Sequence, residues 1–158
     1  MVFANFNYQN YPLIVVTLEE KIKNDDEFIF FCNKWLELYE NKKEFYFLID
    51  TRKCGFISIK YAYKMSKFIN HLKKNAIENY GNQWLKQTIF IVKNNFIMFL
   101  LKLIFNISSP VAPVYITNDM INGLKIYKIL SILENEEEEK KKEIKKLLIP
   151  IYHYYISN

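Results

Sequence analysis

The chain has 158 residues, of which 51% are hydrophobic and 17% aromatic, with only three glycines and four prolines. This composition excludes disorder over most of the length and argues against a loop-rich all-β fold. The net charge of +5 permits an anionic partner without requiring one. Asn, Ile and Lys are abundant and Arg52 is the single arginine, a bias typical of an AT-rich genome that weakens any inference from lysine counts.

Two cysteines, Cys32 and Cys54, are too few for a disulfide framework at this length. The N-terminus lacks the basic and apolar regions of a signal peptide. The longest apolar stretch, 89–107, is interrupted by Lys93 and Lys102, so we expect no membrane span. These features predict a reduced, cytoplasmic protein.

Strands and helices alternate through the first third of the chain. Residues 1–10 allow a short edge strand, and the apolar run 11–18 predicts a buried strand. Asn24 followed by Glu27 forms a capping box. Apolar residues at helical spacing then predict a helix that ends near Glu40.

The alternation continues through the middle of the chain. The uninterrupted apolar run 45–49 is typical of a strand covered on both faces. Ser58 is a good helix N-cap, and the helix after it presents one apolar face. That face comprises Tyr61, Ala62, Met65, Phe68, Ile69 and Leu72. A third strand over 87–92 and a helix over 95–107, apolar nearly all round, follow.

The last third completes the alternation. After a turn at 108–113, residues 114–117 predict a fourth central strand, and Asn118 or Asp119 caps a helix that ends near Leu133. Glutamates four residues before lysines predict an exposed helix over 134–146. Pro150 ends it, and the aromatic segment 151–156 is expected to dock on the rest of the chain.

This order predicts an α/β fold: a mostly parallel, four- to five-stranded sheet flanked by helices, with an added C-terminal helix. We expect one domain over 1–158, with its core in 11–133 and a charged helix and aromatic segment in 134–158. Parallel sheets place their working edge at the carboxyl ends of the strands.

No catalytic signature is present. Gly55, Gly81 and Gly123 are isolated and form no phosphate-binding loop. His71 and His153 lie far apart, without metal ligands at suitable spacing. Cys54 with His71 could be imagined as a nucleophile and its base, but a loop cysteine beside a glycine turn is the simpler interpretation. We therefore predict no enzyme activity, no metal and no cofactor.

Polar residues follow the ends of the predicted strands and form a candidate rim for an anion or a partner. This strand-end rim comprises Asp50, Arg52, Ser58, Lys93, Asn94, Asn95 and Asn118. Ordinary helix capping is the alternative explanation, because Asn, Asp and Ser are the residues that helix starts require.

One face of the predicted helix after Ser58 carries a basic stripe, which comprises Lys60, Lys64, Lys67, His71 and Lys74. The stripe could meet an acidic protein or an anionic membrane surface. A solvated helix face is the alternative interpretation. No aromatic interleaving or nucleic-acid motif accompanies the stripe, so nothing favours nucleic acid.

The helix 95–107 has more apolar surface than one sheet face can bury. If it gates a pocket, helical spacing predicts an inner face of Phe96, Leu100, Leu103 and Ile107. The opposite face, with Met98, Leu101 and Phe105, would then pack on the sheet, or the two faces would be exchanged. The surplus surface could be covered by the C-terminal segment, a second subunit, a ligand or a membrane.

The strand 45–49 with the loop to Ser58, and the segment 84–105 with its strand and apolar helix, resemble the SpoIIAA-like fold. STAS domains and CRAL-TRIO lipid-binding domains share that fold, and 84–105 is similar to the CRAL-TRIO strand and gate helix. The resemblance covers about 11–133 and rests on hydrophobic patterns. Ile59 stands where bacterial STAS antagonists carry a phosphorylated serine, so the resemblance implies the scaffold rather than that switch.

Together these features predict a non-catalytic protein-interaction module of STAS/CRAL-TRIO-like fold, which holds a protein partner at the rim and the basic stripe. The alternative is a small protein that binds a lipid or another hydrophobic ligand, with helix 95–107 as its gate or membrane contact. A homodimer would also cover the apolar helix.

Overall fold

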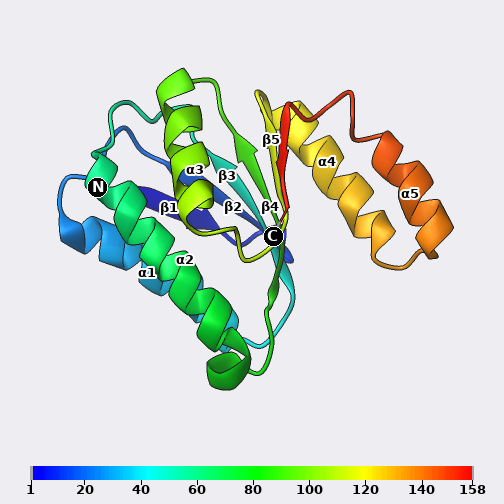
Figure 1. Ribbon diagram of the computed structural model, residues 1–158, viewed down its shortest axis with the longest axis horizontal. Helices are drawn as coiled ribbons and strands as arrows, with labels where there is room; N and C mark the ends of the chain where they lie inside the picture. The colour runs from blue at the N-terminus through cyan, green and yellow to red at the C-terminus, as the bar shows by residue number, and fades with distance from the viewer. Residues whose placement is uncertain (1, 158) are drawn as a thin grey trace.

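The chain folds as a six-stranded sheet with five helices in a computed structural model that describes residues 2–157 (Figure 1). The elements are, in chain order, β1 (Ala4–Asn7), β2 (Leu13–Leu18), α1 (Asp25–Glu40), β3 (Phe45–Asp50), α2 (Ile59–Tyr80), β4 (Leu85–Ile91), α3 (Asn95–Ile107), β5 (Val114–Thr117), α4 (Met120–Leu133), α5 (Glu138–Lys146) and β6 (Tyr154–Ile156). The predicted α/β class is therefore confirmed.

The sheet is mixed, which corrects the expectation of a mostly parallel sheet of four to five strands. Its strands lie in the order β1-β2-β3-β4-β5-β6, and only the inner four are parallel. The first edge is antiparallel because the turn at 8–13 folds the chain back, so that Ala4 pairs with Leu18. The second edge is antiparallel because the aromatic terminus returns along β5, with Tyr155 opposite Tyr115.

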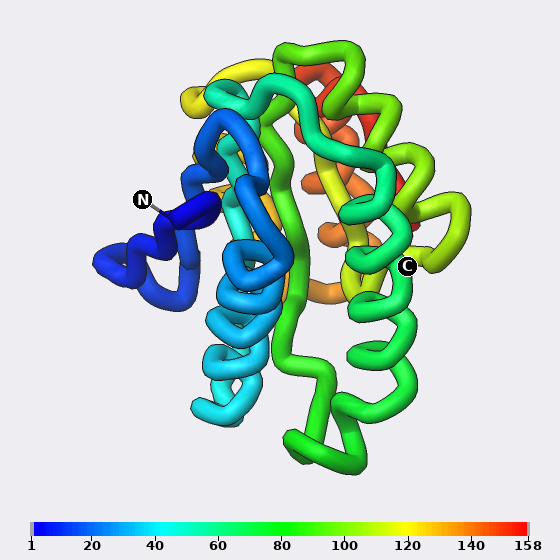
Figure 2. The backbone as a smooth tube through the Cα atoms, turned by 90° about the vertical axis from the view of Figure 1, so that its left-hand side faces the viewer, coloured from blue at the N-terminus to red at the C-terminus, as the bar shows by residue number. Residues whose placement is uncertain are grey.

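The helices form two layers, one on each face of the sheet (Figure 1). Successive parallel strands are direct neighbours, and right-handed crossovers between them place all three connecting helices on one face. Figure 2 views that face, with α1, α2 and α3 in front of the strands. Helices α4 and α5 lie on the other face (Figure 1).

Side chains at the helix starts behave as the sequence predicts. Asn24 accepts from the Glu27 backbone N–H at 3.1 Å, and the Glu27 carboxylate accepts from the Lys23 backbone N–H at 2.7 Å. Asn94 caps α3 and Asp119 caps α4 in the same way. These caps fix where the helices begin relative to the strand ends.

The α4 face of the sheet is closely packed. Ile126 and Leu130 of α4 lie against Leu48 and Ile91 of the sheet in one buried cluster. A Cβ on Gly123 would lie 3.0 Å from Leu48 Cδ1, so the missing side chain lets the helix approach the sheet. None of the helices within residues 2–157 combines the length and apolar character that crossing a bilayer requires.

Candidate functional site: an apolar cavity under three helices

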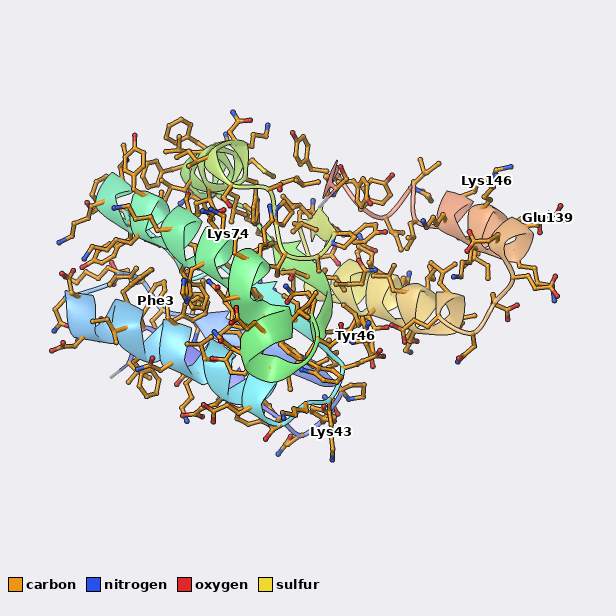
Figure 3. The ribbon with its side chains drawn as sticks, turned by 60° about the horizontal axis from the view of Figure 1, so that its bottom comes forward. Phe3, Lys43, Tyr46, Lys74, Glu139 and Lys146 are labelled. Atoms are coloured by element: carbon orange, nitrogen blue, oxygen red, sulfur yellow. The ribbon has the colours of Figure 1, made fainter. Side chains whose placement is uncertain are left out.

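The opposite face of the sheet holds a cavity of about 120 Å³. Its floor is formed by strand residues, which include Ile49, Thr88, Phe90 and Val114. Its roof is formed by the three helices on that face, and includes Phe28, Phe31 and Trp35 of α1, Tyr61, Ala62, Met65 and Ile69 of α2, and Ile97, Leu100, Leu101, Ile104 and Phe105 of α3. Phe3, labelled in Figure 3, also lines it. The site therefore joins segments from most of the chain.

Two contacts hold the roof together. At the α2–α3 contact, the Ser66 hydroxyl lies 2.9 Å from the Ala62 carbonyl oxygen and 3.3 Å from the Ile104 carbonyl oxygen. At the α1–α2 contact, the Tyr61 hydroxyl donates to Asp25 Oδ1 at 2.9 Å. The helices thus meet at points set by polar side chains, and the apolar space lies between those points and the sheet.

The few polar groups of the cavity wall either form hydrogen bonds within the protein or carry no charge. Thr51 Oγ1 donates to the Ile91 carbonyl oxygen at 2.7 Å, and the Tyr61 hydroxyl is bound to Asp25. Burial raises the pKa of the Cys54 thiol to about 12, so the thiol is protonated near neutral pH. The wall therefore offers an apolar molecule a surface without charge.

An empty space of this size is costly. At about 24 cal/mol per Å³, a cavity of about 120 Å³ would destabilise the fold by about 3 kcal/mol if nothing filled it. That is a large fraction of the 5–15 kcal/mol typical of a whole domain. Natural interiors seldom contain voids much larger than a water molecule, so this space departs from ordinary core packing.

The cavity is partly open to solvent. Most of its lining residues are buried, and the half-buried ones are Leu18, Ile22, Ile57, Met65 and Phe105. Three of these, Leu18, Ile22 and Ile57, lie where β2 and β3 end and their loops begin. We therefore place the mouth at the carboxyl edge of these strands.

The cavity is lined by residues from both of the predicted faces of α3, Leu100 from one and Leu101 and Phe105 from the other. Leu100 lines the cavity, but Phe96 and Leu103 are half-buried outside it and Ile107 is 50% exposed. The inward face is Ile97, Leu100, Leu101 and Ile104. Periodicity could not select this face, because α3 is apolar nearly all round and its rotation is set by contact with both α2 and the sheet.

The strand-end rim forms, but most of its side chains bind within the protein. Arg52 donates to both carboxylate oxygens of Asp50, at 2.9 and 2.8 Å. Burial by itself would raise the pKa of Asp50, but these hydrogen bonds hold it below its usual value. Ser58 and Asn94 serve as helix caps. The remaining rim residues, Lys93, Asn95 and Asn118, are exposed. Binding of a partner or an anion there stays a prediction.

The basic stripe is divided. Lys60 and Lys64 reach the carboxylate of Asp25 on α1, at 3.5 and 2.9 Å, and both lie over the Tyr61 ring. Lys67, His71 and Lys74 are exposed further along α2. The first half of the stripe therefore helps to join α1 to α2. We call this group of contacts, Asp25 with Tyr61, Lys60 and Lys64, the α1–α2 clasp.

Sequence reasoning missed the contribution of α1 and α2 to the cavity. The aromatic residues Phe28, Phe31 and Trp35 were expected as a helix core face, and Ala62 as an ordinary packed alanine. Neither pattern indicates a space, because the same apolar spacing describes a filled core and a hollow one. Only the relative placement of the helices separates the two.

No protein-family model, characterised protein or solved structure matches the chain. The resemblance to STAS and CRAL-TRIO domains therefore stays a prediction.

Proposed function

We propose that the protein binds a small apolar ligand, or the end of one acyl chain, between the sheet and helices α1–α3. The observation that carries this proposal is the cavity of about 120 Å³, whose wall is almost entirely aliphatic and aromatic. An apolar ligand gives up no hydrogen bonds to water on entering the cavity, and it gains the contacts that an empty cavity lacks.

Size limits the ligand. An apolar protein cavity of about 150 Å³ accepts benzene, so this slightly smaller one holds a group of roughly that size. A longer chain would have to extend through the mouth near Leu18, Ile22 and Ile57. Any polar end of such a ligand would then lie outside, near the strand-end rim.

The arrangement also supports, without deciding, a SpoIIAA-like scaffold. Four parallel strands in chain order carry their connecting helices on one face, and the apolar α3 follows β4 where the CRAL-TRIO likeness expects a gate helix. The protein-interaction hypothesis gains less support, because Lys60 and Lys64 of the basic stripe already pair with Asp25.

The test is thermal unfolding with benzene as the probe and with pyrazine, a polar ring of the same size, as its control. Binding to the native state alone stabilises by about 2.7 kcal/mol at a hundredfold excess over Kd. For a chain of this length that corresponds to a rise in Tm of about 5–10 °C. A Tm that benzene leaves unchanged up to its solubility limit would contradict the proposal.

A further inference from the structure

Charge is distributed very unevenly along the chain. Residues 51–118 contain ten basic residues and a single acidic one, Glu78, for a net charge of +9. The remaining residues contain twelve basic and sixteen acidic ones, for a net charge of −4. The modest overall charge of +5 therefore conceals a strongly basic segment.

This basic segment contains α2, β4, α3 and β5, and α2 and α3 lie side by side (Figures 2 and 3). Both helices line the cavity. Lysines of this segment that form no salt bridge with any of residues 2–157 are Lys67, Lys73, Lys74, Lys93 and Lys102. All five are exposed. We call the outer surface of α2, α3 and the loop 52–58 the α2–α3 face.

The α2–α3 face also exposes large apolar side chains. Phe56 is 74% exposed and Phe99 is 51% exposed. The Phe56 ring stacks on Phe96 with centroids 5.3 Å apart, and the Phe96 ring lies 6.3 Å from that of Phe99. Tyr63 and Ile77 of α2 are exposed as well. Three aromatic rings thus form a continuous ladder, with Phe56 and Phe99 exposed and Phe96 half-buried between them.

The ladder lies on the cavity wall. Cys54 and Ile57 flank Phe56 in the chain and line the cavity, and Ile97 and Leu100 do the same beside Phe96 and Phe99. Exposed aromatic side chains, lysines and an apolar space are therefore continuous from the surface inward.

We propose that the α2–α3 face docks on an anionic lipid bilayer, with the ladder Phe56–Phe96–Phe99 at the headgroup–acyl boundary and the free lysines on the headgroups. Aromatic rings with surrounding lysines are the combination that interfacial membrane binding uses. A purely acidic surface would satisfy the lysines but would leave the ladder in contact with charged groups. Exchange of the cavity ligand with the bilayer rests on the proposed function, whereas docking itself does not.

The experiment is co-sedimentation of the full chain with vesicles of phosphatidylcholine alone, and of phosphatidylcholine and phosphatidylglycerol at three to one. We expect binding to the anionic vesicles only, and weaker binding as salt is raised, because salt screens the lysines. The double variant Phe56→Ser, Phe99→Ser and the double variant Lys67→Glu, Lys74→Glu should each lower the partition coefficient at least tenfold.

The matched controls lie on α4, on the opposite side of the sheet. Ile121 is 69% exposed there, and Lys125 and Lys128 are exposed beside it. The variants Ile121→Ser and Lys125→Glu, Lys128→Glu should bind the vesicles as the natural chain does. All the changed side chains are exposed, and circular dichroism checks that each variant folds.

Four results would overturn the docking proposal. They are no binding to anionic vesicles, equal binding to neutral ones, equal losses in the α4 controls, and tighter binding to polyglutamate or to a single-stranded oligonucleotide than to vesicles. Benzene thermal shifts without vesicles separate the two proposals. If the Phe56→Ser, Phe99→Ser variant no longer binds vesicles but keeps the benzene-induced rise in Tm, docking is supported. If the natural chain binds vesicles but benzene does not raise its Tm, the cavity ligand is refuted and docking is not.

Discussion

The two faces of the sheet are built from the same kinds of residue but are packed differently. On the face that carries α4 and α5, α4 lies close against Leu48 and Ile91, because Gly123 has no side chain that would separate them. On the other face three helices cover the sheet and leave a cavity of about 120 Å³. The space between α4 and the strands is therefore filled, whereas the space between α1–α3 and the strands is not. A second pocket of about 110 Å³ lies beyond α4, between β5, β6, the last turn of α5 and the residues that follow it, and is lined by Tyr115, Lys145, Leu148, Tyr152 and Tyr155.

The difference arises from the side chains at the points of closest approach. Glycine allows α4 to reach the strands, whereas the roof of the cavity is held by Ser66 between α2 and α3 and by Tyr61 between α1 and α2. Aromatic side chains lie between α1 and the sheet, as Trp35 shows, whose ring centroid is 5.1 Å from that of Phe47 on β3. A close-packed face and a hollow face can thus share one hydrophobic composition.

The largest expected effect contrasts truncations on the two faces. Leu48 is fully buried in the packed face, and Leu101 lines the cavity. Leu48→Ala should destabilise towards the upper end of the range of about 2–5 kcal/mol for such changes, and Leu101→Ala towards the lower end. Leu101 loses less because part of its surface already lacks neighbours. Urea unfolding measures both, and a greater loss for Leu101→Ala would contradict the contrast.

Enlarging a residue beside the cavity and enlarging a residue in a filled part of the same layer should change the free energy of unfolding in opposite directions. Ala62 lines the cavity, whereas Ala76, on the same helix and fully buried, does not line it. Ala62→Leu should leave the free energy of unfolding unchanged or raise it, because the added atoms enter empty space. Ala76→Leu should lower it by about 1–3 kcal/mol through overpacking.

The same pair of variants tests whether benzene binds in the cavity beside Ala62. Ala62→Leu should abolish the benzene-induced rise in Tm, and Ala76→Leu should keep it. If both alanines tolerate leucine equally, and benzene stabilises both variants, the space under Ala62 is not the binding site.

The α1–α2 clasp, on the cavity side of the sheet, should make the free energy of unfolding depend on pH. Hydrogen bonds from Lys64 and Tyr61 lower the pKa of Asp25 from its usual 3.8 to about 2. Because the folded-state pKa is depressed, the stabilising contribution is complete above about pH 4 and is lost as the pH falls towards 2. Asp25→Asn should therefore be less stable than the natural chain at pH 6, with the difference disappearing near pH 2.

Asp26→Asn is the control for that measurement, because Asp26 also lies in the first turn of α1 but is not part of the clasp. Urea midpoints between pH 2 and pH 7 compare the three chains. A constant difference between Asp25→Asn and the natural chain over that range would show that the clasp is not formed.

The smallest expected effect concerns the floor of the cavity. Thr88 is a buried polar residue that lines it. Thr88→Val should change the free energy of unfolding by no more than about 1.5 kcal/mol, because a single hydroxyl hydrogen bond contributes only about 0.5–1.5 kcal/mol net. It should leave benzene affinity the same or slightly higher. Calorimetric titration with benzene measures the affinity. A marked loss of affinity would mean that the ligand uses the hydroxyl and is less apolar than proposed.

The sequence predicts the alternation of strands and helices well, because caps such as Asn24, Asn94 and Asp119 and apolar runs such as 45–49 are local signals. It does not predict the antiparallel edges. Strand β6 is three residues long, and its pairing with β5 depends on where α5 returns the chain. The aromatic segment was expected to dock, but nothing local indicates that it docks as a strand.

The candidate site was harder to predict than the fold. The apolar excess of residues 95–107 indicates a surface that needs an occupant, and it led to the ligand hypothesis. It could not show which face turns inward, as Ile107 illustrates, nor that Phe31 and Ala62 line the same space. The uneven charge of residues 51–118 was visible in the sequence, but it becomes informative only when α2 and α3 are seen to share one surface.

The most direct test of the central claim is methyl-resolved NMR of the protein titrated with benzene. The account predicts saturable shifts at the cavity methyl groups of Ile97, Leu100, Leu101 and Ile104, and none at Leu48, Ile91 and Ile126 on the packed face. No saturable shifts, or shifts of equal size on both faces of the sheet, would contradict it.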